Sequence, residues 1–402
     1  MWRERMKVPI LIVVIPIATI LVQLFLIRPL LGLALSRSPD YVYRAYVWGE
    51  SDIQDYEKFP SRPIENAAPA FHFKPASLAE AFVPPEGFEA LLEASGTTGF
   101  LVVRDDTLLY ERYFNGFQRD SWFTSFSVAK SFDSALIGIA LSEGLIGSVD
   151  DPVITYIPEL AGRGLDGLTI RNLLKMDCGV RYRESDLLDI LAMLGDDSKT
   201  YYMPDLRALA LTIRPSGEPL GSCFLYNNYH PILEGMILER VTGMTVSEYM
   251  QERLWKPLGM EYPATWSINQ EGDGLEKLES GLNARAVDFA KFGRLYLNLG
   301  RWEGKQILPE DWVIESTEPE VGETRPQAGA DRYAEPEGYY KYHWWGTKRE
   351  NGLYDFTAAG HLGQYIFVRP DQNLVIVRFG TETDTRVDWF LKFPELAQML
   401  GG

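Results

Sequence analysis

The amino-acid sequence predicts an α+β fold in which an antiparallel sheet, drawn from both ends of the chain, is flanked by helices. Residues 99–113 have the pattern of a β-hairpin, and β patterning returns only from residue 342 onward. Residues 150–281, which lie between these parts, are helix-and-loop in character. Strands at both ends of a chain with helices between them favour one domain whose sheet closes from two distant segments, here with a helical insertion.

Composition limits the classes of protein that this chain can belong to. It has 402 residues with 46% hydrophobic content, which suffices for one large or two medium globular domains. The 39 basic and 56 acidic residues give a net charge of −17, which makes nucleic acid an unfavourable partner. Two cysteines cannot form a four-cysteine zinc site or a disulfide-built scaffold, although they could form one bridge.

Residues 1–34 predict a membrane anchor. No charged residue occurs from position 8 to 27, and a 20-residue helix at about 1.5 Å per residue spans a bilayer core of roughly 30 Å. The basic residues at positions 3, 5 and 7 place the N-terminus in the cytoplasm and the rest of the chain outside, in the periplasm if the source is Gram-negative. The alternative is a signal peptide cleaved near the small residues at 32–34. Either interpretation exports the rest of the chain.

The first elements after this segment follow from proline content and periodicity. Residues 35–95 are proline-rich and are interpreted as a spacer. The runs 99–104 and 107–113 are β-rich, and Asp105-Asp106 between them predicts a hairpin turn. Apolar residues with helical spacing then predict a mostly buried helix over 127–143 that ends at Gly144.

The remainder of the chain supplies further helices and then strands. The clearest helical segments are 169–176, 231–241, 246–254 and 284–299. The predicted C-terminal strands are 342–348, 354–358, 365–369 and 374–379.

The first chemical motif is Ser127-Val128-Ala129-Lys130, which places a hydroxyl and an amine on one face at the start of a helix. A serine hydroxyl is a weak nucleophile unless a nearby base takes its proton. The helix N-terminus adds partial positive charge and free N–H groups where an oxyanion would form. By itself, S-x-x-K arises about once by chance in a chain of this length, so an ordinary helix surface explains it equally well.

Two further motifs follow in the sequence. In residues 226–228, Tyr226 could shuttle a proton, and Asn228 could hold the lysine or a substrate amide. Residues 360–364, Gly-His-Leu-Gly-Gln, lie just before a predicted strand, where small residues let a strand edge approach a substrate. A lone histidine such as His361 is more often structural than catalytic, but the glycine pair favours a site wall.

The order of these three motifs resembles that of the serine β-lactamase and penicillin-binding-protein superfamily. The Tyr-x-Asn and His-x-Gly elements are similar to those of its class C-type, esterase and 6-aminohexanoate-dimer hydrolase branch. The resemblance covers roughly residues 99–379. It implies a β-lactamase/transpeptidase-like serine hydrolase domain over 96–402, with the helical insertion at about 150–281.

The resemblance implies roles for individual residues. Ser127 would be the acylated nucleophile, Lys130 would assist its deprotonation, and Tyr226 would shuttle the proton. Asn228 would position Lys130 or substrate. The oxyanion hole would consist of the backbone N–H groups of Ser127 and Gln364.

The third motif departs from the pattern usual in lactamases and transpeptidases. His361 replaces a lysine that helps to bind a substrate carboxylate, and histidine is mostly neutral at pH 7. This favours hydrolysis of a small ester or amide over β-lactamase or D,D-peptidase activity. Gly363 and Gln364 would line the site beside His361, and Tyr182 would reach its mouth.

Alternative functions are weaker. A non-catalytic ligand-binding protein of this fold would have no need to retain Ser127, Lys130 and Tyr226 together. No cofactor is expected, because Gly162–Gly167 match G-x-G-x-x-G without a preceding strand, and no metal site, because the four histidines are scattered and no H-E-x-x-H occurs. The family fold would bring Cys178 and Cys223 near one site, so a disulfide between them is a hypothesis beside two free thiols.

Overall fold

The computed structural model describes residues 40–183, 195–320, 338–382 and 387–401. The described chain forms two compact units, a small one from residues 40–51 and 195–204 and a large one from the rest. The small unit holds helices α3 (Asp40–Trp48) and α7 (Asp196–Tyr202). Tyr41 and Val42 of α3 pack there against Tyr202 of α7.

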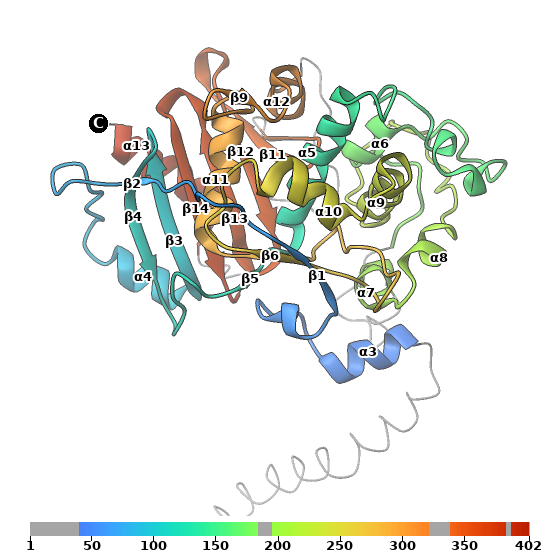
Figure 1. Ribbon diagram of the computed structural model, residues 1–402, viewed down its shortest axis with the longest axis horizontal. Helices are drawn as coiled ribbons and strands as arrows, with labels where there is room; N and C mark the ends of the chain where they lie inside the picture. Colours follow the sequence, from blue (N-terminus) through green and yellow to red (C-terminus); the bar gives the residue numbers. More distant parts are fainter. Residues whose placement is uncertain (1–39, 184–194, 321–337, 383–386, 402) are drawn as a thin grey trace, which may run out of the picture. The chain divides into compact units, whose positions relative to one another are not determined.

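An eight-stranded sheet forms the centre of the large unit (Figure 1). Strand β3 pairs antiparallel with β14, so strands from both ends of the chain close one sheet, as predicted. All other neighbours are antiparallel except β2 and β4. The order is β10 (Gly338–Lys341), β11 (Trp344–Lys348), β12 (Tyr354–Gly360), β13 (Gln364–Arg369), β14 (Leu374–Gly380), β3 (Thr97–Arg104), β4 (Thr107–Tyr113) and β2 (Lys74–Pro75).

The predicted hairpin between β3 and β4 is confirmed. Asp105 and Asp106 both have positive φ, at 49° and 60°. A two-residue type I′ turn needs positive φ at both central residues, and aspartate tolerates this conformation better than most side chains.

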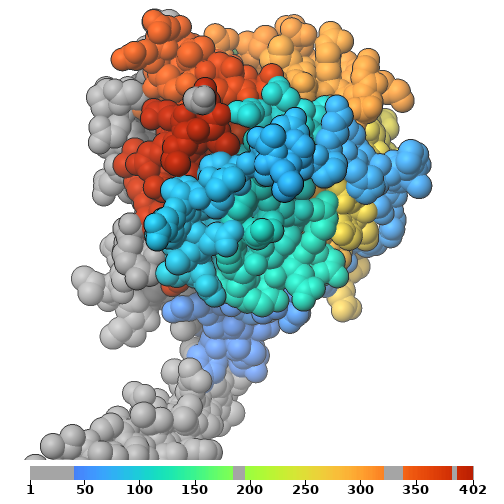
Figure 2. Space-filling model, turned by 90° about the vertical axis from the view of Figure 1, so that its left-hand side faces the viewer, coloured from blue at the N-terminus to red at the C-terminus, as the bar shows by residue number. Residues whose placement is uncertain are grey.

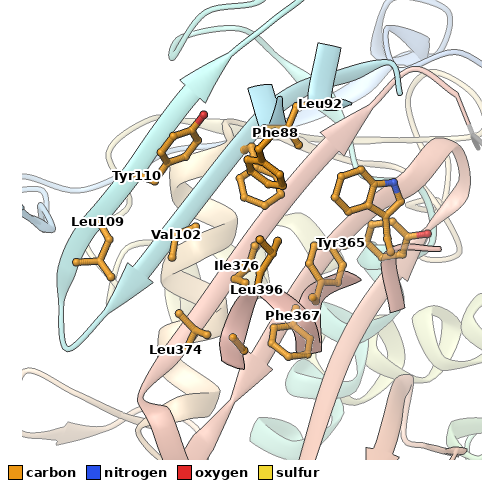
Figure 3. Packing of buried hydrophobic residues seen from close by; sticks show 14 of the residues in the cluster. Phe88, Leu92, Val102, Leu109, Tyr110, Tyr365, Phe367, Leu374, Ile376 and Leu396 are labelled. Atoms are coloured by element: carbon orange, nitrogen blue, oxygen red, sulfur yellow. The ribbon is translucent and has the colours of Figure 1, made fainter. Parts of the chain in front are cut away.

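Helices cover both faces of this sheet. On one face, α4 (Phe88–Ala94) and α13 (Trp389–Gly401) pack on alternate residues of the strands, including Val102, Phe367 and Ile376 (Figure 3). On the other face lies α11 (Ala286–Leu297), where a Cβ at Gly293 would stand only 2.7 Å from a methyl group of Val375. Because both faces are buried, the central strands are continuously apolar rather than alternating. Figure 2 views the edge of the sheet that ends with β2, where the light-blue chain around β2 and α4 lies beside the teal β4.

A second, four-stranded sheet has the order β1 (Ser61–Ile64), β6 (Ala264–Ser267), β7 (Leu282–Ala284) and β5 (Phe123–Thr124), and all its pairs are antiparallel. None of these strands was predicted, because each has four residues or fewer and shows no resolvable period. A small hairpin, β8 (Arg301–Trp302) and β9 (Lys305–Gln306), completes the strands.

The predicted helices are confirmed with small shifts of their ends. The buried helix α5 (Ala129–Ser142) follows the single turn η3 (Phe126–Val128) and packs against α9 (Tyr229–Thr242). The other helices are α6 (Ile170–Leu174), α8 (Leu206–Ala210), α10 (Val246–Met250), the π-turn η7 (Gln251–Trp255) and α12 (Glu310–Thr317). Short 3₁₀ turns are η2 (Asp55–Glu57), η4 (Val153–Thr155), η5 (Pro158–Leu160), η9 (Glu350–Gly352), η10 (His361–Gly363) and η11 (Pro370–Gln372).

The transmembrane part of the fold prediction is corrected. Across the described ranges, every helix is too short or too polar to cross a membrane. Residues 8–27, on which the prediction of an anchor depended, lie outside the described residues. For the part of the chain that the structure describes, the fold class is therefore the α+β domain, with no membrane-spanning helix among its elements.

Candidate active site

Ser127 lies where the chain reverses between β5 and α5. The reversal needs a positive φ of 47° at Phe126, whose ring is buried. A bulky residue seldom adopts this conformation, and it persists only where surrounding packing holds it. The turn leaves Ser127 half-buried at the start of the helix.

Lys130 stands beside Ser127, as the three-residue spacing on a helix predicts. Its side chain is 1% exposed, and its Nζ donates to Ser127 Oγ at 3.0 Å and to the backbone oxygen of Glu279 at 2.7 Å. The loop that carries this carbonyl is fixed by a buried ion pair of 2.6 Å between Lys277 Nζ and Glu279 Oε1. Glu279 was missed from the sequence because any residue can supply a backbone carbonyl.

Tyr226 completes the group of predicted catalytic side chains. The Nζ of Lys130 lies 5.0 Å from the centroid of its ring. The same ring stacks on Trp345 of β11, with centroids 5.9 Å apart, and meets the ring of Tyr340 of β10 nearly at a right angle, at 6.1 Å. Strand residues that sequence reasoning did not assign to the site thus hold Tyr226 in place.

A disulfide joins Cys178 and Cys223, with Cα atoms 5.2 Å apart, which confirms that hypothesis. Around it, the backbone N–H of Cys178 donates to the carbonyl of Cys223 at 2.7 Å, and Asp177 pairs with Phe224. The bridge fastens the segment leading into Tyr226 to the loop after α6.

Asn228 and Tyr182 are brought together by a hydrogen bond. The side-chain amide of Asn228 donates to the hydroxyl of Tyr182 at 3.2 Å, and the ring of Tyr182 packs edge-on against Tyr229 at 5.8 Å. The Oδ1 of Asn228 is buried and accepts no hydrogen bond within the described part of the chain. The amide group of Asn228 thus contacts Tyr182, and its predicted role on Lys130 or substrate stays a prediction.

The third motif lies against the backbone of Ser127. Gly360 ends β12 and pairs with Gln364 at the start of β13. A Cβ at Gly360 would lie 2.4 Å from the oxygen of Ser125 and 3.2 Å from the nitrogen of Ser127, so only glycine permits this approach. His361 is exposed, and its ring meets that of Phe126 edge-on at 5.4 Å.

Gly363 and Gln364 shape the start of β13. Gly363 has a φ of +81°, and its carbonyl accepts from the buried guanidinium of Arg378 at 2.6 Å. The side chain of Gln364 is buried and exchanges two hydrogen bonds with the backbone of Gly380, at 2.7 and 3.0 Å. That side chain fixes the strand, and the oxyanion role of the backbone N–H of Gln364 stays a prediction.

Comparison with known proteins accords with this geometry. The Beta-lactamase family profile matches residues 88–398. The chain belongs to the Beta-lactamase family. Among its relatives in this family, the 6-aminohexanoate-dimer hydrolase of Paenarthrobacter ureafaciens is 30% identical over 349 residues, which cover 82% of this chain and 85% of that protein.

Solved structures of Beta-lactamase-family type share the fold. A Bacillus anthracis protein provisionally named 6-aminohexanoate-dimer hydrolase superposes with a TM-score of 0.74 at 25% identity, covering 90% of this chain and 96% of that one. A penicillin binding protein from Bacillus halodurans gives 0.59 at 18% identity, covering 77% and 99%. The second likeness concerns the fold alone.

Proposed function

We propose that this protein is a serine hydrolase that cleaves a small ester or amide through an acyl-serine intermediate. The observation that carries the proposal is the 3.0 Å hydrogen bond between Lys130 Nζ and Ser127 Oγ at the start of α5. A nucleophile within hydrogen-bond reach of a base that a third group orients is the arrangement required for covalent catalysis, and the carbonyl of Glu279 is that third group.

In the proposed reaction, Ser127 Oγ attacks the substrate carbonyl carbon while Lys130, as the neutral amine, takes up the hydroxyl proton. The carbonyl oxygen becomes negative between the N–H groups of Ser127 and Gln364, and one such donor is worth about 10²–10³ in rate. Tyr226, whose ring centroid lies 5.0 Å from Lys130 Nζ, gives its hydroxyl proton to the departing alcohol or amine and recovers a proton from Lys130. Water then attacks the acyl-serine, and the reversed proton transfers release the acid and restore Ser127.

A short amide is the preferred substrate class. The relative from Paenarthrobacter ureafaciens is named for the 6-aminohexanoate dimer and matches most of this chain, which supports testing that dimer first. The third motif offers the exposed His361 where lactamases and transpeptidases have a lysine, which disfavours a substrate held by its carboxylate.

We further propose that the domain matures in an oxidising compartment, because it carries the Cys178–Cys223 disulfide. Trapping thiols with an alkylating reagent at the moment of cell lysis tests this. Two alkylated cysteines in the freshly made protein would contradict it.

The deciding experiment is the intact mass of the protein after incubation with a serine-reactive fluorophosphonate. Wild type is expected to gain one adduct, and Ser127→Ala none. Ser142→Ala, which removes a hydroxyl at the far end of the same helix, is the matched control and should label like wild type.

A folded wild type that gains no adduct would overturn the hydrolase proposal and support a ligand-binding protein instead. After labelling is shown, initial rates with a nitrophenyl ester, the 6-aminohexanoate dimer and a chromogenic cephalosporin rank ester, amide and lactam hydrolysis.

A further inference from the structure

Three ionisable side chains that the proposed mechanism does not use meet in the interior of the large unit. They are Asp133 of α5, Glu234 of α9 and His343 of the turn between β10 and β11. Each is fully or almost fully buried, and one polar atom from each lies within 4.8 Å of the others. Burial of such groups is costly unless they share hydrogen bonds. No sequence pattern reveals the cluster, because its members lie about a hundred residues apart.

The hydrogen bonds of the cluster have a defined direction. His343 Nε2 lies 2.8 Å from Glu234 Oε2, and since a carboxylate only accepts, Nε2 carries the hydrogen. The other ring nitrogen, Nδ1, lies 3.0 Å from the hydroxyl of Tyr340. Burial, and then the charge of Glu234, hold the pKa of Asp133 well above its usual range.

Tyr340 links this buried chain to the active site. Its ring is 4% exposed and packs with Phe224 and Met176, so its hydroxyl needs an internal partner, which His343 supplies. The same ring meets that of Tyr226 nearly at a right angle, and Trp345 contacts both rings. The hydrogen bond between the Tyr340 hydroxyl and His343 therefore fixes a ring against which Tyr226 packs.

The turn that carries His343 is also fastened to the nucleophile's helix. Ser131, the neighbour of Lys130 on α5, donates its hydroxyl hydrogen to the carbonyl of His343 at 2.7 Å. Through this bond and the Tyr340 ring, the spacing between Lys130 and Tyr226 is set by one continuous set of contacts. Errors of about 1 Å in such spacing can cost 10² in rate.

We propose that Tyr340, anchored by His343 and Glu234, is a positioning residue that holds Tyr226 for proton transfer. The inference rests on the proposed hydrolase function. It predicts that loss of the Tyr340 hydroxyl slows turnover while substrate binding is retained, because Tyr340 acts through Tyr226.

The test compares Tyr340→Phe with Tyr339→Phe. The variant at 340 keeps the ring and removes the anchored oxygen, whereas the neighbouring hydroxyl of Tyr339 donates to the carbonyl of Thr317, away from Tyr226. With an ester substrate, we expect kcat of Tyr340→Phe to fall about tenfold or more with KM within about twofold. Tyr339→Phe should keep the kcat of wild type, and thermal unfolding shows that both variants are folded.

A double-mutant cycle tests the chain behind Tyr340. Glu234→Gln should lower kcat in the same way, and adding it to Tyr340→Phe should cause little further loss, because both changes release the same anchor. If the losses in kcat multiply fully in the double variant, the proposed link from Glu234 through His343 to Tyr340 is wrong. Stoichiometric metal that is present in wild type and lost in Glu234→Gln would also overturn it, because a cation would then lie between Glu234 and His343.

The two proposals fail separately. If wild type gains no fluorophosphonate adduct, the hydrolase function itself is wrong. If wild type labels at Ser127 and Tyr340→Phe turns over as fast as Tyr339→Phe, only the positioning role is wrong.

Discussion

At the scale of single residues, Lys130 shows how a helix converts sequence spacing into chemistry. Residues three apart at the start of α5 face the same way, and burial then limits the hydrogen bonds of Lys130 Nζ to the Ser127 hydroxyl and the Glu279 carbonyl. A flexible surface lysine would exchange such contacts with water. The fixed geometry makes Lys130 the first residue to test after Ser127.

Replacing Lys130 with alanine should lower kcat/KM by about 10²–10⁴, the usual contribution of a positioned base. The second-order rate of fluorophosphonate labelling should fall in parallel, since labelling uses the same deprotonation. Lys392→Ala, at a half-buried lysine of α13 that pairs with Glu395, is the control and should label like wild type. Undiminished labelling of a folded Lys130→Ala protein would exclude Lys130 as the base.

His230 is a second residue whose environment gives a measurable consequence. It is fully buried on α9, and burial lowers its pKa to about 4, despite the opposing charge of Glu234. In the unfolded chain its pKa is about 6.5, so between these values the unfolded state binds the proton and stability falls as the pH falls. At pH 5 this costs about 2 kcal/mol of the free energy of unfolding, at about 1.4 kcal/mol per pKa unit.

When the pH is lowered from 7 to 5, the free energy of unfolding should therefore fall by about 2 kcal/mol less in His230→Gln than in wild type, as measured by urea unfolding. An acid-induced loss in His230→Gln equal to that of wild type would show that His230 is not the group responsible.

At the scale of elements, the third motif shows why a turn can demand glycine. Gly363 combines a positive φ with a close neighbour, because a Cβ there would lie 2.0 Å from Nη1 of Arg378. Gly352, before β12, also has a positive φ, at +74°, but faces open space. Comparing substitutions at Gly352 and Gly363 therefore separates the cost of backbone strain from the cost of a steric clash.

Gly352→Ala should lower stability by about 1 kcal/mol, the cost of a left-handed conformation alone. Gly363→Ala should cost at least about 2 kcal/mol more in chemical denaturation, since Arg378 must leave its carbonyl partner. It should also slow fluorophosphonate labelling of Ser127, because the next residue is Gln364, whose backbone N–H is the proposed oxyanion donor. Equal losses in the two variants would show that the Arg378 contact is unimportant.

At the scale of the whole molecule, the periodicity of apolar residues predicted the long helices and strands. Enough residues to show a period are present in the buried helix α5 and in the strands β3, β13 and β14. The order of the three motifs predicted that Ser127, Lys130 and Tyr226 belong to one site. The short strands of the second sheet carry no such period. Residues such as Glu279 and Tyr340 join the site through a carbonyl or a tertiary contact, for which one sequence has no signal.

The Cys178–Cys223 bridge stabilises the large unit by linking segments 45 residues apart. Closing a loop of this length is worth about 4 kcal/mol in the chain-entropy model, within a usual range of about 2–5 kcal/mol. The Cys178→Ala/Cys223→Ala double variant should lose stability of that size in urea unfolding. It should also lose kcat, because Tyr226 lies three residues beyond the bridge. The control is wild type with its disulfide reduced and alkylated, which should match the variant. Unchanged stability in both would mean that backbone pairing between the two segments already suffices to hold Tyr226.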